Sequence, residues 1–118
     1  MNLIKIIKEN SFIIDVISQN LYWTDSIQRT VEVMSLETGA RIILMKENDR
    51  LLDIVLAPEM SIMFIAQVGN RGGSILKASM DGKNRKVLAH MDGHPSAISY
   101  SRDTQHIFWY TPVRNFFY

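Results

Sequence analysis

The sequence predicts an all-β fold made of repeated units of four short antiparallel strands, and three registers of self-similarity support this prediction. Aromatic-rich segments recur at residues 21–25 (LYWTD), 63–67 (MFIAQ) and 107–111 (IFWYT). Shorter apolar segments recur at residues 12–15, 54–57 and 98–101. Residues 31–44 and 75–88 align at a constant offset of 44 positions. The aromatic segments lie 42 and then 44 positions apart, so all three registers describe one repeat.

Each part of the middle repeat reads as a strand or a turn. The expected strands are 51–57, 62–68, 74–80 and 85–91. β-branched and aromatic residues dominate these runs, and no stretch of roughly 12 residues shows a helical period with caps. Pro58 marks the first turn, and Asp81 with Gly82 marks the third. The Gly-rich loop VGNRGG lies between them, and its extra residues account for the difference between the offsets of 42 and 44.

A repeat of 42 to 44 residues with four strands matches one blade of a β-propeller. We therefore expect a first blade at residues 1–49, a second at 50–91 and an incomplete third at 92–118. Neighbouring blades cover both faces of each blade, so both faces of a strand can be apolar. The chain then holds fewer than three blades.

The segment NLYWTD illustrates this double burial. Alternation along a strand sends Tyr22 and Thr24 to one face, and Leu21, Trp23 and Asp25 to the other. Burying one large aromatic side chain is worth about 4–6 kcal/mol before opposing terms are counted. Asp25 ends the strand and is expected to accept hydrogen bonds from nearby backbone N–H groups. Packing between blades is expected for Tyr22, Trp23, Phe64, Phe108 and Trp109.

Composition and charge exclude several classes of function. The 118 residues are 47% hydrophobic and 21% charged, which suits a folded domain or part of one. The 13 basic and 12 acidic residues nearly cancel, so no charge pattern favours nucleic acid or an anionic membrane. Without cysteine, the segment holds no disulfide and no thiolate metal site. Charged residues interrupt positions 1–18, so no signal peptide is expected there, and no apolar run approaches the roughly 18 residues of a membrane span.

The first repeat resembles the YWTD (class B) repeats of the low-density lipoprotein receptor family. The likeness is closest at residues 13–25, IIDVISQNLYWTD, where Tyr22, Trp23, Thr24 and Asp25 form the motif. It extends over essentially the whole chain, although the later repeats diverge.

In the second repeat the turn at Asp81 and Gly82 is typical of the family, whereas MFIAQ lacks the Trp, Thr and Asp of the motif. The third repeat keeps Trp109 but places Tyr110 and Thr111 where the motif has Thr and Asp. These departures leave the strand pattern intact and put blade geometry in question.

The resemblance implies a six-bladed propeller, of which this chain is a segment, in a larger receptor. It implies an extracellular location at the plasma membrane or in the endosome lumen, flanking EGF-like modules, and a transmembrane segment elsewhere in the parent. The implied partner is a protein ligand: a lipoprotein, a yolk protein or a signalling protein. No cofactor, metal, catalytic residue or nucleic acid is implied. An endocytic receptor is the leading interpretation, and a signalling receptor of the sevenless kinase or Wnt co-receptor type is the alternative.

Strand direction places the candidate binding surface. In an up-and-down blade, the loops between second and third strands and between blades open on one face. That face is expected to carry Arg29, Lys46, Glu47, Asp49, Arg50, Arg71, Asp92, His94 and Arg114. Arginine is enriched at interface anchors, so the candidate protein-binding residues are Arg29, Arg50, Arg71 and Arg114. Acid-triggered release would need histidines, but no motif assigns that role to His90, His94 or His106, which read as surface residues.

Two further classes are weaker matches. A propeller hydrolase needs several metal ligands from different blades around a central channel, and the recurring innermost segments offer one carboxylate, Asp15. A WD40 scaffold places Asp directly after Trp, whereas Thr24 separates Trp23 from Asp25 here.

Overall fold

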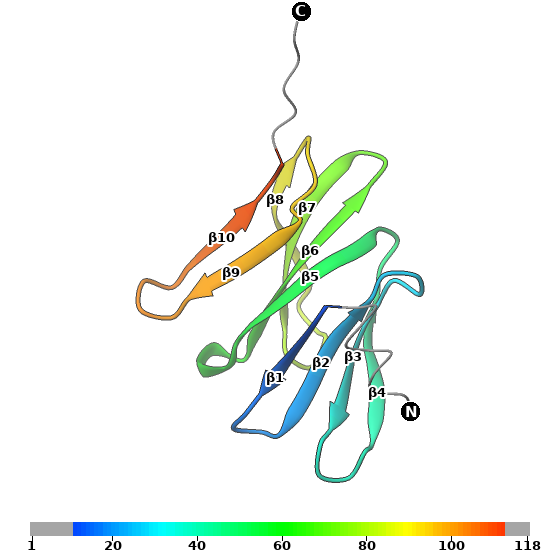
Figure 1. Cartoon of the computed structure of the whole chain (residues 1–118), viewed down its shortest axis with the longest axis vertical. Helices are drawn as coiled ribbons and strands as arrows, with labels where there is room; N and C mark the ends of the chain where they lie inside the picture. Colours follow the sequence, from blue (N-terminus) through cyan, green and yellow to red (C-terminus); the bar gives the residue numbers. More distant parts are fainter. Residues whose placement is uncertain (1–10, 113–118) are drawn as a thin grey trace, which may run out of the picture.

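The computed structural model describes residues 11–112, and within that range its regular elements are strands, apart from one 3-10 helix (Figure 1). The elements are β1 (Phe12–Asp15), β2 (Asn20–Asp25), β3 (Thr30–Ser35), β4 (Arg41–Lys46), β5 (Arg50–Ala57), η1 (Pro58–Met60), β6 (Ile62–Gly69), β7 (Gly72–Ser79), β8 (Lys86–Met91), β9 (Ala97–Ser101) and β10 (His106–Tyr110). The single-turn 3-10 helix η1 begins at the proline that the sequence marked as a turn. The predicted all-β class is therefore confirmed.

The strands form three antiparallel sheets, each in the order of the chain. β1–β4 form the first blade, β5–β8 the second, and β9 with β10 the third. Figure 1 shows the three sheets side by side, and the first strands of neighbouring blades, β1 with β5 and β5 with β9, lie in contact. This is the arrangement of propeller blades, in which the first strand of each blade is innermost.

Asp side chains accept backbone N–H groups in turns of both complete blades, among them the β1–β2 turn and the β7–β8 turn. Asp15 accepts the N–H of Ile17 at 3.2 Å, and Asp81 accepts the N–H of Lys83 at 2.9 Å. Such side-chain bonds satisfy backbone groups that the strand ladder leaves free. The last residue before the next strand then takes a positive φ in several turns, as at Gln19, Arg29, Ser61 and Gln105.

Two apolar clusters join the blades. Tyr22, Val31 and Met45 of the first blade pack with Leu51, Ile54, Met63, Ile65 and Leu76 of the second. On the other side of the second blade, Ala57, Phe64, Ala66 and Ile75 pack with Ile98. Along β6, Met63 and Ile65 therefore face the first blade while Phe64 and Ala66 face the third. The strand is buried on both faces, as the period-2 pattern predicts.

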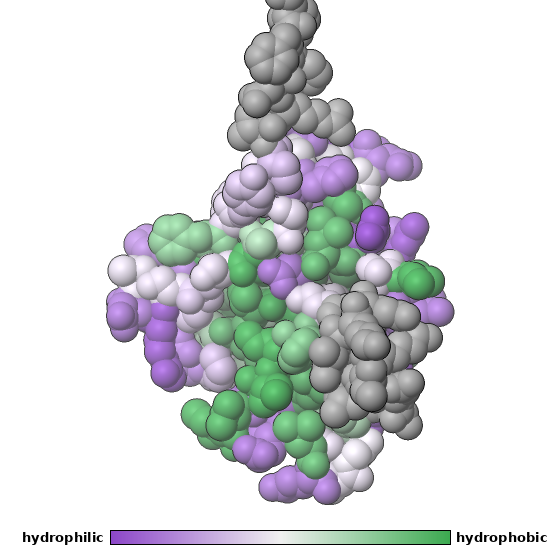
Figure 2. All heavy atoms as spheres, viewed as in Figure 1, coloured by the Kyte–Doolittle hydropathy of each residue, from purple (hydrophilic) through white to green (hydrophobic). Residues whose placement is uncertain are grey.

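The packing expected of Phe108 and Trp109 is not seen. These side chains are 57% and 44% exposed. Apolar residues are also gathered on the face that carries the first strands of the blades (Figure 2). For Phe108 the reason is that it occupies the position of Tyr22, which faces the following blade. Within the described residues no further blade follows β9 and β10.

A second expectation is also corrected. The innermost strands carry two carboxylates, since β5 includes Asp53 as well as the recurring segment 54–57. Asp53 lies within the expected strand 51–57, but it precedes the recurring segment, to which the count of carboxylates was restricted. The pairing of β5 with β6 shifts register between Leu51 and Asp53, and a bulge of this kind adds a residue without breaking the strand.

Candidate functional site

Connections from all three blades meet at one end of the molecule, which we call the loop face. It comprises the β2–β3 turn, the β4–β5 connection, the β6–β7 turn and the β8–β9 connection. Arg29 ties the first two together, because its carbonyl accepts the N–H of Glu47 at 2.8 Å and its guanidinium donates to the Asn48 carbonyl. Close packing joins the last two, since a β-carbon on Gly72 would overlap the Met91 carbonyl oxygen.

The structure separates the four candidate arginines. Arg29 is exposed but is held by the bond to Asn48. Arg50 and Arg71 are exposed and make no hydrogen bond or ion pair with any described residue. Arg114 lies outside the described residues. Two cations, Arg50 and Arg71, are therefore available at this end for an external partner.

The histidines do not form a cluster of metal-binding type. His94 is exposed in the β8–β9 connection, His90 is exposed in β8, and His106 begins β10. The part of the chain that the structure describes contains no group of three or more His, Cys, Asp or Glu side chains able to hold a metal ion. Between residues 11 and 112 there is also no helix with the length and apolar character needed to cross a membrane.

A polar cleft of about 390 Å³ opens between the first and second blades at the loop face. Its lining is Lys46, Glu47, Asn48, Asp49, Gln67 and Arg85. Glu47 is buried, and Arg85 of the second blade pairs with it at 2.6 Å. The hydrogen bonds to Glu47, together with the charges of Glu47 and Asp49, raise the pKa of the Arg85 guanidinium above its usual range, so the cation at this blade boundary stays protonated.

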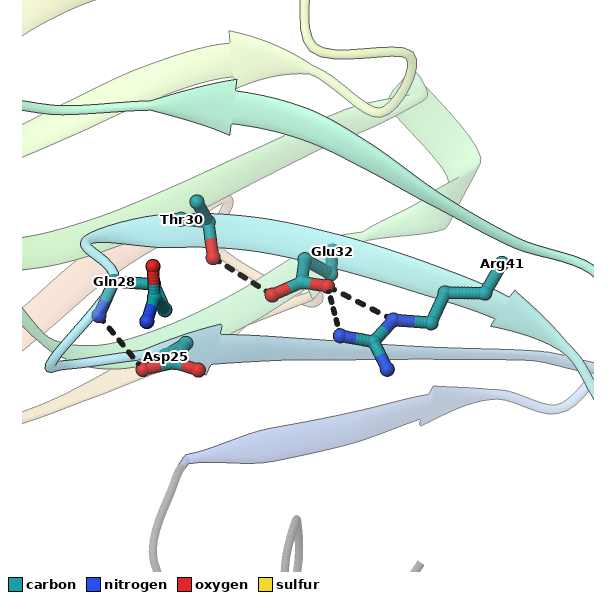
Figure 3. Close-up of polar contacts among 5 residues, drawn as sticks. All are labelled: Asp25, Gln28, Thr30, Glu32 and Arg41. Atoms are coloured by element: carbon teal, nitrogen blue, oxygen red, sulfur yellow. Dashed lines mark hydrogen bonds and ion pairs between the residues drawn. The ribbon is translucent and has the colours of Figure 1, made fainter. Parts of the chain in front are cut away.

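The YWTD residues lie in the first blade, next to a second ion pair. Trp23 is 1% exposed, and the Arg41 guanidinium lies 5.1 Å from its ring centroid. Arg41 donates to Glu32 Oε1 at 2.6 and 2.9 Å, and Thr30 donates to Oε2 of the same carboxylate at 2.7 Å (Figure 3). The buried Glu32 thus holds the cation over the indole, an attractive arrangement for an aromatic face.

The remaining motif residues are engaged within the protein. The N–H of Thr24 donates to the Ser11 carbonyl at 2.9 Å, and its side chain is buried. Asp25 accepts the N–H groups of Ile27 and Gln28 at 3.0 and 2.9 Å, the role expected for it (Figure 3).

Tyr22 connects the motif to the second blade. Its ring lies in the cluster between the blades, and its hydroxyl donates to the Met80 carbonyl at 3.4 Å. Burial, followed by the charges of Asp15 and Asp81, raises the pKa of the Tyr22 hydroxyl. The hydroxyl therefore stays protonated and remains a donor at neutral pH.

The Asp81 and Gly82 turn lies against the first blade. Gly82 has φ of +88°, and a β-carbon there would overlap the carbonyl oxygen of Leu44 in β4. Glycine is needed here both for the backbone conformation and for the close approach of the neighbouring blade. Trp109, the motif tryptophan of the third blade, is half exposed and makes no comparable contact with Arg.

Sequence reasoning missed three side chains that the fold brings into use: Asp53, Gln67 and Arg85. A signal existed for each. Arg85 aligns with Arg41 at the offset of 44, and Gln67 aligns with Asp25 at the offset of 42. Asp53 directly precedes a recurring apolar segment. Asp53 and Arg85 have partners on other blades, which a repeat register cannot show.

Repeated four-stranded sheets, packed face to face through apolar side chains, define this chain as part of a β-propeller. The chain is 33% identical over 76 residues to low-density lipoprotein receptor-related protein 5 of Mus musculus, and 30% identical over 76 residues to that of Homo sapiens. Each match covers 64% of this chain and 5% of the relative, so the chain spans a small part of the curated relatives. The repeats of this chain are similar to the YWTD (class B) repeats of the low-density lipoprotein receptor family.

The solved structures agree on the fold. A chain in the crystal structure of a nidogen/laminin complex matches with a TM-score of 0.79 at 22% identity. The match covers 85% of this chain and 39% of that chain. No family model matches the sequence.

Proposed function

We propose that this chain is part of a non-catalytic, extracellular propeller that binds a protein ligand within a receptor of the low-density lipoprotein receptor family. One observation carries the proposal: Tyr22 and Trp23 of the motif are buried inside the protein, while the side chains of Arg50 and Arg71 stand free on the loop face. Exposed arginines without internal partners are the side chains most suited to anchoring a protein ligand.

The carboxylates of the innermost strands support a non-catalytic role. Asp15 accepts the Ser18 hydroxyl at 2.7 Å as well as backbone N–H groups. Asp53 accepts the Ser11 hydroxyl at 2.6 Å and two backbone N–H groups. Both are used in holding the fold together, whereas a metal-dependent hydrolase would present such groups to a bound metal.

We place the propeller in an endocytic receptor whose ligand is a lipoprotein or yolk protein, with EGF-like modules and a membrane anchor elsewhere in the parent. A signalling receptor is the alternative, and the same loop face would then bind a secreted signalling protein. The likeness to a receptor-related protein supports the receptor class common to both. Arg50 and Arg71 are the proposed binding residues for an endocytic receptor and for a signalling receptor alike.

The test is binding of purified low-density lipoprotein to the immobilised chain, measured by biolayer interferometry. The double variant Arg50→Ala/Arg71→Ala should bind about tenfold or more weakly, since each anchor is worth about 1 kcal/mol. The matched control is Lys83→Ala/Lys86→Ala, which removes two exposed charges at or near the β7–β8 turn. Equal losses in both double variants, or no binding by the unmodified chain, would contradict the proposed lipoprotein ligand.

A further inference from the structure

Gln67 is a buried side chain with an unused acceptor. It is 4% exposed, and its Nε2 donates to the Ser74 hydroxyl at 2.9 Å. Its Oε1 is the one buried side-chain polar atom, among the described residues, that has no hydrogen-bond partner. Buried acceptors are nearly always paired in folded proteins, so this oxygen calls for a donor from outside the chain.

The departure from the motif explains why the acceptor is free. Gln67 occupies the position of Asp25, whose carboxylate accepts two N–H groups of its own turn. In the second blade β6 continues to Gly69, and Val68 and Gly69 pair with β7. The amide therefore has no turn of the Asp25 type to organise, and it lies on the face of β6 that carries Met63 and Ile65 toward the first blade.

Gln67 lines the polar cleft, and its unpaired Oε1 is buried behind that lining. Asp49 lines the cleft as well; its side chain makes no hydrogen bond or ion pair within the described residues, although its charge acts on the Arg85 guanidinium. The Asp49 carboxylate is held against Gly69, where a β-carbon would overlap it. Glu47, the other carboxylate of the cleft, is already neutralised by Arg85. The acceptors left without a hydrogen bond are thus an amide oxygen and a carboxylate, and the Lys46 ammonium on the same lining is also unpaired.

We propose that this cleft binds a basic side chain, arginine or lysine, of the protein ligand. The proposal rests on the proposed function, because it names the chemistry of the ligand at one point of the loop face. A guanidinium has several N–H donors in a rigid plane, and an ammonium has three. Either can donate to the Asp49 carboxylate, and a bond to Gln67 Oε1 as well requires the side chains that cover this buried oxygen to move aside. Lys46 is the opposing charge at the rim, and its exposed side chain has no internal partner.

The test uses the ¹⁵N-labelled full chain, titrated with acetyl-arginine amide and followed by NMR. Saturable shifts are expected at the Gln67 side-chain amide and the Asp49 backbone amide. Acetyl-citrulline amide has the same shape without the charge and should bind at least fivefold more weakly. Asp49→Asn should weaken arginine binding about fivefold or more and leave the fold unchanged. Asp92→Asn, which removes the same charge from the β8–β9 connection on the loop face, is the matched control and should have no effect.

The Lys46→Ala variant shows whether the cleft binds a cation or an anion. A cation site predicts two- to threefold tighter arginine binding in this variant, because a like charge has been removed. Weaker binding of acetate or acetyl-glutamate in the same variant, with no response to arginine, would overturn the proposal in favour of an anion site. Equal shifts with arginine and citrulline would also overturn it. The NMR titration contains no protein ligand. Its outcome therefore tests the cleft separately from the lipoprotein-binding experiment, and either can fail without the other.

Discussion

The backbone N–H of Ile98 donates a 2.8 Å hydrogen bond to Oδ2 of Asp53 and so links the innermost strands of the second and third blades. Oδ1 of the same carboxylate accepts the Ser11 hydroxyl, from the residue before β1, at 2.6 Å. It also accepts the N–H of Ile54 at 2.9 Å. One side chain on the middle blade therefore contacts both neighbours, in addition to the apolar packing between the sheets.

Asp53→Ala should destabilise the chain by about 1–3 kcal/mol, because it leaves the Ile98 N–H and the Ser11 hydroxyl without their acceptor. Hydrogen exchange at the Ile98 amide should become faster by more than the global loss of stability accounts for. The control is Asp103→Ala, which removes an exposed carboxylate from the β9–β10 turn. Unchanged exchange at Ile98 in the Asp53 variant would show that apolar packing alone joins the third blade.

Gly82→Ala should cost more than a glycine substitution elsewhere with a similar backbone. Gly39 has φ of +76° with open space where a β-carbon would lie, so Gly39→Ala should cost about 1–2 kcal/mol for the left-handed conformation alone. Gly82→Ala adds the overlap with the Leu44 carbonyl and should cost about 2–4 kcal/mol. Urea denaturation of both variants measures the difference. Equal costs would mean that β4 shifts freely away from the turn.

The two tryptophans should differ sharply in their contribution to stability. Trp23 is 1% exposed, so Trp23→Ala should destabilise the chain by about 3–5 kcal/mol. Trp109 is 44% exposed, and Trp109→Ala should cost about 1 kcal/mol or less. Fluorescence reports the same contrast, since the chain has only these two tryptophans. The Trp109→Phe variant should keep the emission of a buried indole, and Trp23→Phe should lose it.

Sequence reasoning succeeded where the chemistry is local or repeated. Alternation along 20–25 predicted the two buried faces of β2, and the turn role of Asp25 followed from its place at a strand end. Each depends on neighbours within a few positions. The four strands of the middle blade followed from the same kind of pattern, with ends displaced by one or two residues.

Reasoning from the repeat failed where equivalent residues find different partners. Arg41 and Arg85 align, yet Arg41 pairs with Glu32 of its own blade and Arg85 with Glu47 of the preceding one. The position of Glu32 is Leu76 in the second blade, so Arg85 has no acceptor there. Gln67 and Asp25 diverge for a similar reason, because the turns that follow them differ. The candidate cleft therefore arises where the second blade departs from the motif, and only the packed structure shows it.

Acid stability should depend on the contact between Tyr100 and Glu59, which joins β9 to η1. The Tyr100 hydroxyl donates to Glu59 Oε1 at 2.8 Å, and Arg102 lies 3.8 Å from the other oxygen. The pKa of Glu59 is lowered, first by its own backbone N–H, then by Tyr100, and to a lesser degree by Arg102. A carboxyl whose pKa is lowered in the folded state contributes stability above its unfolded pKa. That contribution is lost as the pH falls through the folded value.

Tyr100→Phe should therefore raise the pKa of Glu59 while leaving it below its usual value, because the backbone N–H remains. Burial and the bond to Glu59 raise the pKa of the Tyr100 hydroxyl, so the donor stays protonated throughout the acid range. The measurement is NMR titration of the Glu59 carboxyl carbon between about pH 2 and pH 7. Tyr110→Phe removes an exposed hydroxyl from β10 and should leave the curve unchanged. If the Tyr100 variant titrates like the unmodified chain, the hydroxyl does not stabilise the carboxylate in solution.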